Sequence, residues 1–205
     1  MEFTITISII IVTAIISFTA FNNEKITNDL IFWPPMISEK KQYYRFITSG
    51  LIHADVMHLL FNMMTLYFFG RAMEDFFVAK IGKVGFLLFY IAGIIVSEIP
   101  SFLKNRNNYS YRSLGASGAV TAVLFSFILL APWQTMYVFF LPLPAIVFAV
   151  LYIAYTFYMD KRGGDYVNHS AHLWGAIWGI AFTLLMEPKV LPHFLEQLMQ
   201  PRFGL

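Results

Sequence analysis

The segment SLGASGAV, residues 113–120, separates a hydrophilic stretch, KNRNNYSYR, from a long apolar run, TAVLFSFILLAPW. A chain that changes this abruptly from polar to apolar is typical of a helix that begins at the edge of a membrane. Two glycines, Gly115 and Gly118, flank the single serine Ser117 at this edge. Because glycine permits tight turns and lets other backbones come close, the segment predicts that Ser117 begins a helix in close contact with another part of the chain.

The composition of the whole chain is that of a membrane protein. Hydrophobic residues make up 58% of the 205 residues, aromatic residues 18% and charged residues 13%, and the mean hydropathy is +0.64. Six apolar segments are each long enough to cross a hydrocarbon core of about 30 Å. They cover about residues 4–21, 51–70, 84–103, 114–131, 137–159 and 171–186. We expect an all-α membrane protein, a bundle of six transmembrane helices that forms one domain over residues 1–205.

Charge and cysteine content narrow the possible partners. The net charge of +2 and the scattered basic residues argue against nucleic acid and leave the lipid bilayer as the expected environment. The chain has no cysteine, which excludes disulfides and thiolate metal sites. No basic residue precedes the first apolar segment, so we expect a retained helix instead of a signal peptide.

The distribution of lysine and arginine over the loops bears on the orientation of the chain in the membrane. With the N-terminus inside, nine of the 14 lysines and arginines would lie in outer loops. These nine are Lys25, Lys40, Lys41, Arg45, Lys104, Arg106, Arg112, Lys161 and Arg162. Since cytoplasmic loops are normally the ones rich in lysine and arginine, this count alone favours an outer N-terminus.

Four polar side chains lie within or at the ends of the predicted spans, where such groups are costly and usually mark a site. His58 and Asn62 are four residues apart and share one face of the second predicted helix. Ser117 begins the fourth and His172 begins the sixth. Taken alone, a serine in a span is more typical of packing or of a bond to a carbonyl, and His58 with Asn62 could equally well form a hydrogen bond between helices.

Small residues predict that two of these groups meet. A strip of small side chains spaced by four runs along the sixth predicted helix beside His172: Ala171, Gly175 and Gly179. With Gly115 and Gly118 it lets the fourth and sixth helices approach closely, which would bring the Ser117 hydroxyl to the His172 imidazole. This pair is a nucleophile with its general base. His58, Asn62 and the free N–H groups of the fourth helix could then stabilise an oxyanion.

On these motifs the sequence resembles the rhomboid family of intramembrane serine proteases. GASG matches G-x-S-G, AHLWGAIWG matches A-H-x-x-G-x-x-x-G, and HADVMHLLFN matches H-x-x-x-N with the earlier histidine His53. The motifs occur in the family's order, and the resemblance spans residues 43–179. It implies a protease that cuts single-span membrane proteins in or near their transmembrane helices and uses no metal or other cofactor.

The resemblance also implies roles for particular residues. Ser117 would be the nucleophile, His172 the base, His58 and Asn62 the oxyanion donors, and Gly115 part of the oxyanion loop. Supporting or nearby roles fall to His53, Arg45 in YYRF, Glu74 in GRAME, Gly118, Ala171, Gly175 and Gly179. The family's six-helix form further implies a cytosolic N-terminus, which we prefer to the charge count, in the plasma membrane of a bacterium.

Several points stay open. Well-studied bacterial members have a tyrosine four residues after the serine that stacks on the histidine, whereas this chain has Thr121. Tyr111, Trp174 and Thr121 itself are alternatives for orienting His172. His169 competes as the base, but it falls in a polar segment outside the glycine strip. With Asp55 and Asp165 near loops and Glu98 and Asp75 near other helix ends, we expect a Ser-His dyad without an acid. Asn168, His169 and Ser170 are predicted to line a polar cavity.

Three other functions compete with an active protease. A catalytically inactive relative that binds membrane proteins is the main alternative, although both Ser117 and His172 are present. A transporter would show related halves, and no internal repeat is visible. A haem or metal site would require two of His53, His58, His169 and His172 to face one centre with open space between them, whereas the glycine strip predicts tight packing. A zinc-dependent intramembrane protease is set aside because the sequence has no H-E-x-x-H motif.

Overall fold

The computed structural model describes residues 4–138, 140–165 and 167–201, and most of them are helical. The longer helices are α1 (Ile5–Phe21), α5 (Val56–Thr65), α6 (Arg71–Asn105), α7 (Ser117–Leu130), α8 (Ala145–Arg162) and α9 (His169–Met186). A π-helical stretch, Leu66–Gly70, joins α5 to α6. The remaining helices are α2 (Glu24–Leu30), α3 (Pro34–Lys40), α4 (Arg45–Thr48) and α10 (Val190–Met199), and the 3-10 turn Ser49–Leu51 follows α4. Strands β1 (Thr135–Val138) and β2 (Leu141–Pro144) form an antiparallel hairpin.

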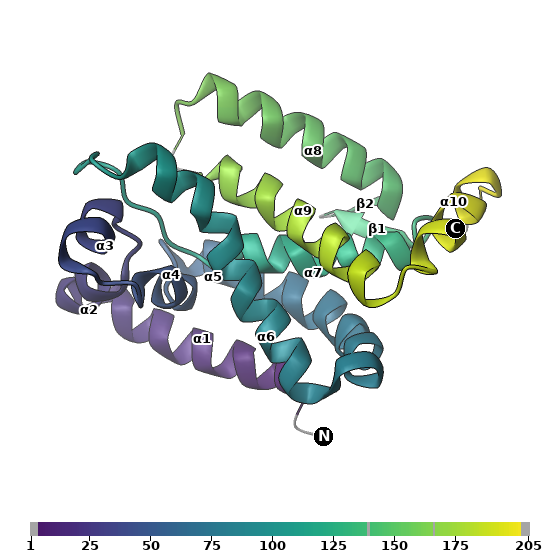
Figure 1. Ribbon diagram of the computed structural model, residues 1–205, viewed down its shortest axis with the longest axis horizontal. Coiled ribbons are helices and arrows are strands. Elements are labelled where there is room, and N and C mark those ends of the chain that lie inside the picture. The colour runs from purple at the N-terminus through teal and green to yellow at the C-terminus, as the bar shows by residue number, and fades with distance from the viewer. Residues whose placement is uncertain (1–3, 139, 166, 202–205) are drawn as a thin grey trace.

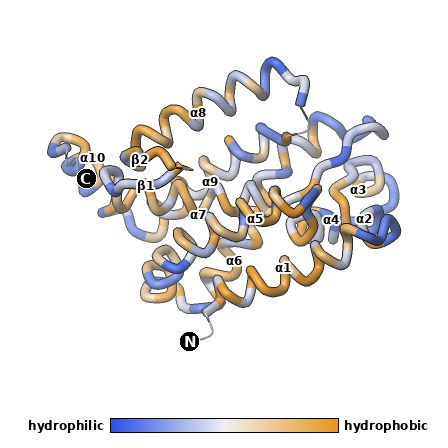
Figure 2. Tube along the Cα trace, turned by 180° about the vertical axis from the view of Figure 1, so that it is seen from behind, coloured by the Kyte–Doolittle hydropathy of each residue, from blue (hydrophilic) through white to orange (hydrophobic). Residues whose placement is uncertain are grey.

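Helices α6, α7 and α9 form the centre of the molecule, and α1 and α8 lie on opposite sides of them (Figure 1). Hydrophobic residues run along the long helices, whereas hydrophilic residues gather in and around α2, α3 and the segment between α8 and α9 (Figure 2). Aromatic side chains fill much of the core, where Phe77, Phe86 and Phe89 are fully buried and contact Phe182 or one another. The central helices are therefore anchored on a packed core that can hold a site rigidly.

Within the described residues, one helical run, Val56–Asn105, is both long enough and apolar enough to cross a membrane by these two criteria. Ile5–Phe21 and Ser117–Leu130 are apolar but shorter. The mostly helical fold agrees with the predicted class, while the six membrane crossings stay a prediction.

The second and third predicted helices begin at clearly different residues in the structure. The second, expected from residue 51, begins only at Val56 because the Asp55 side chain accepts a hydrogen bond from the His58 N–H at 2.8 Å and caps the helix. The third, expected from residue 84, begins at Arg71 and is interrupted at Gly82, where φ is +73°. Glycine adopts this left-handed conformation at little cost, so the chain can change direction there.

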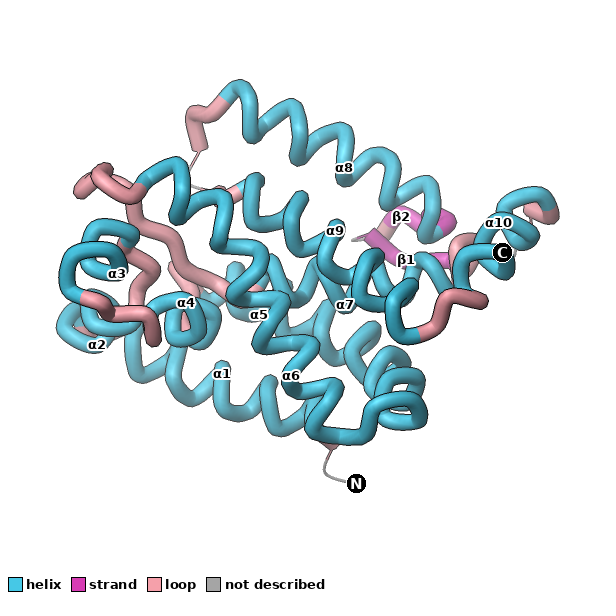
Figure 3. The backbone as a smooth tube through the Cα atoms, viewed as in Figure 1, coloured by secondary structure: helices cyan, strands magenta, loops and turns pink. Residues whose placement is uncertain are grey.

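The fifth predicted helix contains the largest error. Residues 137–138 and 141–144 belong to the strands β1 and β2, and α8 begins only at Ala145 (Figure 3). Pro142 and Pro144 have no N–H and would interrupt a helix, whereas both are tolerated in a short strand at the edge of a sheet. Hydropathy alone could not separate this apolar strand from the apolar helix that follows.

Helices α7 and α9 approach as closely as the small residues predicted. A Cβ atom added to Gly175 would lie 2.2 Å from the Gly118 carbonyl oxygen, and one added to Gly179 would lie 2.1 Å from that of Ala122. The expectation for Gly118 itself needs a correction. Its missing side chain points mainly at α6, since a Cβ there would lie 2.1 Å from Ser97 Oγ, so Gly118 lets α6 as well as α9 come close.

Candidate active site

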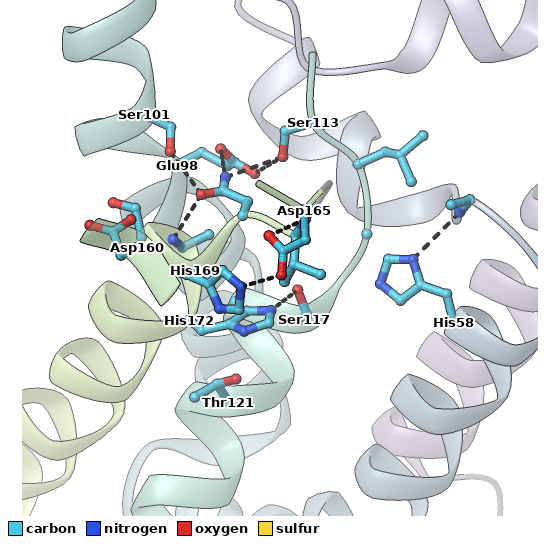
Figure 4. Close-up of a pocket in the computed structure, with 18 of the residues that line it drawn as sticks. His58, Glu98, Ser101, Ser113, Ser117, Thr121, Asp160, Asp165, His169 and His172 are labelled. Atoms are coloured by element: carbon cyan, nitrogen blue, oxygen red, sulfur yellow. Dashed lines mark hydrogen bonds and ion pairs between the residues drawn. The ribbon is translucent and has the colours of Figure 1, made fainter. Parts of the chain in front are cut away.

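The structure brings Ser117 and His172 into contact. Ser117 is the first residue of α7, His172 lies in the first turn of α9, and His172 Nε2 is 2.8 Å from Ser117 Oγ (Figure 4). Both residues line a cavity of about 940 Å³. If Nε2 is to accept the hydroxyl proton, Nδ1 must carry the ring hydrogen. Among the described residues, that Nδ1 has no hydrogen-bond partner.

The backbone before Ser117 turns sharply at Gly115, whose φ is +117°. The Gly115 N–H donates to the Ser49 carbonyl at 2.9 Å, and the Ala116 N–H faces His53 Nε2 at 3.4 Å. Neither amide therefore points freely into the cavity, which differs from the expected oxyanion loop at Gly115. The Ser117 N–H, in the first turn of α7, has no partner among the described residues.

His53 connects the first helix to this turn. Its Nδ1 lies 2.9 Å from Ser17 Oγ, and that hydroxyl donates to the Leu51 carbonyl at 3.0 Å. These contacts, with Nε2 accepting from Ala116, require the hydrogen on Nδ1. His53 is buried and contacts the main chain next to the nucleophile, without contacting Ser117 itself.

His58 and Asn62 lie across the cavity from the dyad, and both line it. His58 Nδ1 accepts a long hydrogen bond, 3.5 Å, from the Ala54 N–H, which leaves the hydrogen on Nε2. A Cβ atom on Gly115 would lie 2.9 Å from this Nε2, so only glycine leaves room for the ring. Asn62 is buried, and its Nδ2 donates to the His58 carbonyl at 3.2 Å. The Asn62 amide has a second N–H in addition to this one.

The ring stacked on His172 is Tyr152 of α8, with ring centroids 6.0 Å apart and planes 25° apart. The Tyr152 hydroxyl lies 3.2 Å from Thr121 Oγ1, so Thr121 contacts the stacking ring instead of the histidine. The three alternatives considered from the sequence did not include Tyr152. It lies among several aromatic residues in FAVLYIAYTFY, and only the packing of α8 on α9 distinguishes it from its neighbours.

His169 begins α9 instead of belonging to the preceding loop, and its Nε2 lies 3.0 Å from Asp165 Oδ2. This hydrogen bond holds the pKa of Asp165 below its usual value. The His169 ring is edge-on to His172, with centroids 6.0 Å apart. Of the two histidines, His172 is therefore the one in contact with Ser117. Asn168, His169 and Ser170 line the cavity, as predicted.

Glu98, which the sequence places near another helix end, lies closer to the dyad than that position suggests. Glu98 is buried and lines the same cavity as Ser117, as does Asp165. The sequence separates Glu98 from the dyad by a polar loop, and only the return of α7 beside α6 brings them together. Within the described part of the chain, neither acid contacts His172 by a hydrogen bond.

Arg45 and Glu74 bind the main chain away from the dyad. Arg45 is buried, and its NH1 donates to the carbonyls of Asn28 and Ile31 at 2.8 and 2.7 Å, which holds the segment of short helices α2 to α4. The Glu74 carboxylate accepts from the N–H groups of Ile5 and Thr6 at 2.7 and 2.8 Å, so it satisfies the free N–H groups at the start of α1. Across residues 4–138, 140–165 and 167–201, no group of three or more His, Asp or Glu side chains is placed to hold a metal ion.

A helical chain with a part-buried Ser-His contact at a cavity defines a candidate membrane-embedded serine hydrolase, and comparison with known proteins identifies the family. The model of the rhomboid domain matches residues 40–189. The chain therefore belongs to the rhomboid family, whose members are integral membrane proteins.

The chain is similar to named rhomboid proteins, and it covers different shares of their length. Rhomboid protease GlpG of Haemophilus influenzae is 27% identical over 167 residues, which is 82% of this chain and 81% of the relative. RHOMBOID-like protein 12, mitochondrial, of Arabidopsis thaliana is 32% identical over 146 residues, which is 63% of this chain and 42% of the relative. Rhomboid protease GluP of Bacillus subtilis is 29% identical over 150 residues, 72% of this chain but only 27% of the relative. The family includes named proteases, and the relatives come from both bacteria and mitochondria.

Proposed function

We propose that this protein is an intramembrane serine endopeptidase that hydrolyses peptide bonds in or near the transmembrane helices of single-span membrane proteins. The observation that carries the proposal is the 2.8 Å contact between Ser117 Oγ and His172 Nε2 at the edge of a cavity of about 940 Å³. Membership of a family that includes named proteases supports the same activity.

In this reaction Ser117 Oγ attacks the substrate carbonyl while its proton passes to His172 Nε2. The imidazolium then gives that proton to the leaving amine, and the acyl group stays on Ser117. Water, activated by the same Nε2, releases the acyl group and restores the serine. Asn168, His169 and Ser170 give this cavity a polar wall along which water can reach the ester.

The negative oxygen that forms on the substrate requires donors aimed at it. His58 carries its hydrogen on Nε2 beside Gly115, Asn62 has a second N–H, and the Ser117 N–H has no partner in the described parts of the chain. Removal of one such donor in a serine protease costs about 2.7–4 kcal/mol of transition-state stabilisation. We assign Gly115 a supporting role, because its absent side chain makes room for His58.

The test combines two assays in detergent or lipid. Wild-type protein should react with a fluorophosphonate probe at Ser117 and cleave a model transmembrane substrate. Ser117→Ala and His172→Ala should each abolish both activities, and the double variant should be no worse because the two residues act as a unit. His169→Ala is the matched control and should retain activity. Loss in His169→Ala together with substantial activity in His172→Ala would overturn the assignment of the base.

The inactive, membrane-binding alternative makes the opposite prediction in the same assay. A folded wild-type protein that neither reacts with the probe nor cleaves any of several substrates with small residues near a helix end would support it. The dyad contact favours the active enzyme, because the hydrogen bond that activates the serine is already formed in the structure.

We further propose a single six-span domain with a cytosolic N-terminus in the plasma membrane of a bacterium, which the similarity to bacterial relatives supports. The chain has no cysteine, so single cysteines can be introduced without background labelling. Cysteines at the exposed positions Asn107 and Arg162 should react with an impermeant thiol reagent in intact cells, whereas one at Lys83 should react only after lysis. The reverse pattern would place the N-terminus outside.

A further inference from the structure

Glu98 is a buried acid that the proposed mechanism does not use. It lies towards the end of α6, only 5% of its surface is exposed, and its two carboxylate oxygens bind different segments of the chain. Oε1 accepts from Ser113 Oγ at 2.9 Å, and Oε2 accepts from Asn168 Nδ2 at 3.0 Å (Figure 4). One side chain therefore links α6, the segment before α7 and the segment before α9.

Each partner stands four residues before a member of the dyad. Ser113 precedes Ser117, and its main chain is fixed by two hydrogen bonds with Phe32, at 3.0 and 3.1 Å. Asn168 precedes His172, and its Oδ1 caps α9 by accepting from the Ala171 N–H at 3.1 Å. Any shift of either segment along or across α6 would therefore move Ser117 relative to His172.

The two partners also bind each other and a second residue of α6. Asn168 Nδ2 donates to Ser113 Oγ at 3.2 Å, and Asn168 Oδ1 accepts from Ser101 Oγ at 3.1 Å. Both amide hydrogens and the amide oxygen of Asn168 are thus used, and its orientation is fixed by all of its neighbours. A fully satisfied buried network of this kind specifies one geometry.

We propose that Glu98 is a positioning residue whose carboxylate holds the segments before α7 and α9 in register, so that Ser117 Oγ and His172 Nε2 stay within hydrogen-bond distance. The proposal rests on the proposed protease function. It assigns Glu98 no contact with the substrate and no part in proton transfer, since both of its oxygens are directed at Ser113 and Asn168 and not at His172.

The donors around Glu98 fit an ionised carboxylate. Ser113 and Asn168 each present a hydrogen to it, and a carboxylate needs no acceptor in return. Tyr111 lies nearby, and burial raises the pKa of its hydroxyl to about 12. Removing a carboxylate from water costs about as much free energy as its hydrogen bonds return, so a buried acid adds little to the stability of the fold. A role in fixing the geometry of the site therefore explains Glu98 better than a role in stability.

A swap of charge between two residues tests the proposal. Glu98→Gln keeps the size of the side chain but turns one acceptor oxygen into a donor, so the hydrogen that Ser113 or Asn168 gives to that oxygen loses its acceptor. In the double variant Glu98→Gln with Asn168→Asp, the new amide at position 98 can donate to the new carboxylate at position 168, which still caps the Ala171 N–H. The control is Ser126→Ala, which removes a buried hydrogen bond of 3.1 Å between α7 and the Gly179 carbonyl at a distance from the cavity.

The readouts are the rate of fluorophosphonate labelling at Ser117, the separate kcat and KM for a model substrate, and the melting temperature. Glu98→Gln should slow labelling and lower kcat by about 10- to 100-fold with KM little changed, the range expected for a misplaced catalytic group. The double variant should recover most of the labelling rate. Ser126→Ala should lower the melting temperature and leave labelling at the native rate.

Each possible result has one meaning. Native labelling by Glu98→Gln would overturn the positioning role, even if its melting temperature fell. If Glu98→Gln does not fold, the double variant decides, since a folded double variant that labels far below the wild-type rate would also overturn it. A wild-type protein that never labels contradicts the proposed protease instead, and so the two failures are distinct.

Discussion

The α7–α9 pair is held in one way beside the cavity and in another at the opposite end. At Gly179, backbone meets backbone with almost no side chain between, and Ser126 Oγ bridges the Ala122 and Gly179 carbonyls at 2.9 and 3.1 Å. Beside the cavity, side chains from α6 and α8 also contact this pair: Glu98 accepts a hydrogen bond from Asn168, and the Tyr152 ring stacks on His172. Rigid packing at one end thus allows an open, hydrogen-bonded site at the other.

The largest expected effect comes from breaking the packed end. Gly179→Val should disrupt the bundle and abolish labelling of Ser117 together, because even a Cβ atom there would lie 2.1 Å from the Ala122 carbonyl oxygen. Gly175→Val should likewise disrupt the bundle and abolish labelling. Thermal unfolding monitored by circular dichroism measures the effect, and Ile177→Val, a half-exposed position on the same helix, is the control. Normal melting and full activity in both glycine variants would mean that this contact does not hold the site.

The next largest effect is expected beside the cavity, for the two proposed oxyanion donors. Asn62→Ala should lower kcat by about 10- to 1000-fold, because the lost donor acts mainly in the transition state. Its one observed hydrogen bond runs to a carbonyl of its own helix, so the melting temperature should change little. His58→Ala should also slow labelling, since the phosphoryl oxygen of the probe takes the place of the oxyanion. Native labelling rates with clearly lower melting temperatures would assign both residues to the scaffold.

A smaller effect is expected for the ring that stacks on His172. Tyr152→Leu removes an aromatic contact worth about 0.5–1.5 kcal/mol, which corresponds to about a 2- to 10-fold loss in kcat. Tyr152→Phe keeps the ring and loses only the contact with Thr121 at 3.2 Å, so it should retain most of the activity. Steady-state kinetics of the two variants and of Thr121→Val separate stacking from hydrogen bonding. Equal losses in Tyr152→Leu and Tyr152→Phe would contradict the stacking role.

The smallest effect is expected at Asp165, which is paired with His169 near the surface of the cavity. Asp165→Asn should change kcat less than about fivefold, because Asp165 itself is exposed and makes no hydrogen bond to Ser117 or His172. Because the hydrogen bond lowers the pKa of Asp165, its contribution is present above the usual aspartate pKa and is lost as the pH falls through the lowered value. The ratio of wild-type to variant activity should thus be constant from about pH 6 to 8. A ratio that changes within this interval would show that another group titrates with the pair.

The sequence alone identified the residues that meet at the centre of the site. The motif around Ser117, the histidine at the start of the sixth apolar segment and the small residues four apart are local patterns, and a helix places residues four apart on one face whatever surrounds it. The resemblance that these motifs carried is confirmed by the match of the rhomboid domain over residues 40–189. The mostly helical class followed from composition in the same way.

Tertiary structure decided what surrounds that pair. Tyr152, Glu98 and the capture of the Gly115 N–H by Ser49 all depend on contacts between segments distant in the sequence. Helices that are apolar on nearly every side, such as α7, give no periodic signal of which face meets which neighbour. Hydropathy likewise could not tell the strand before Ala145 from the helix after it. Short sequence motifs therefore identify the reactive residues of the site, whereas the residues that contact and orient them are determined only by the packing of the helices.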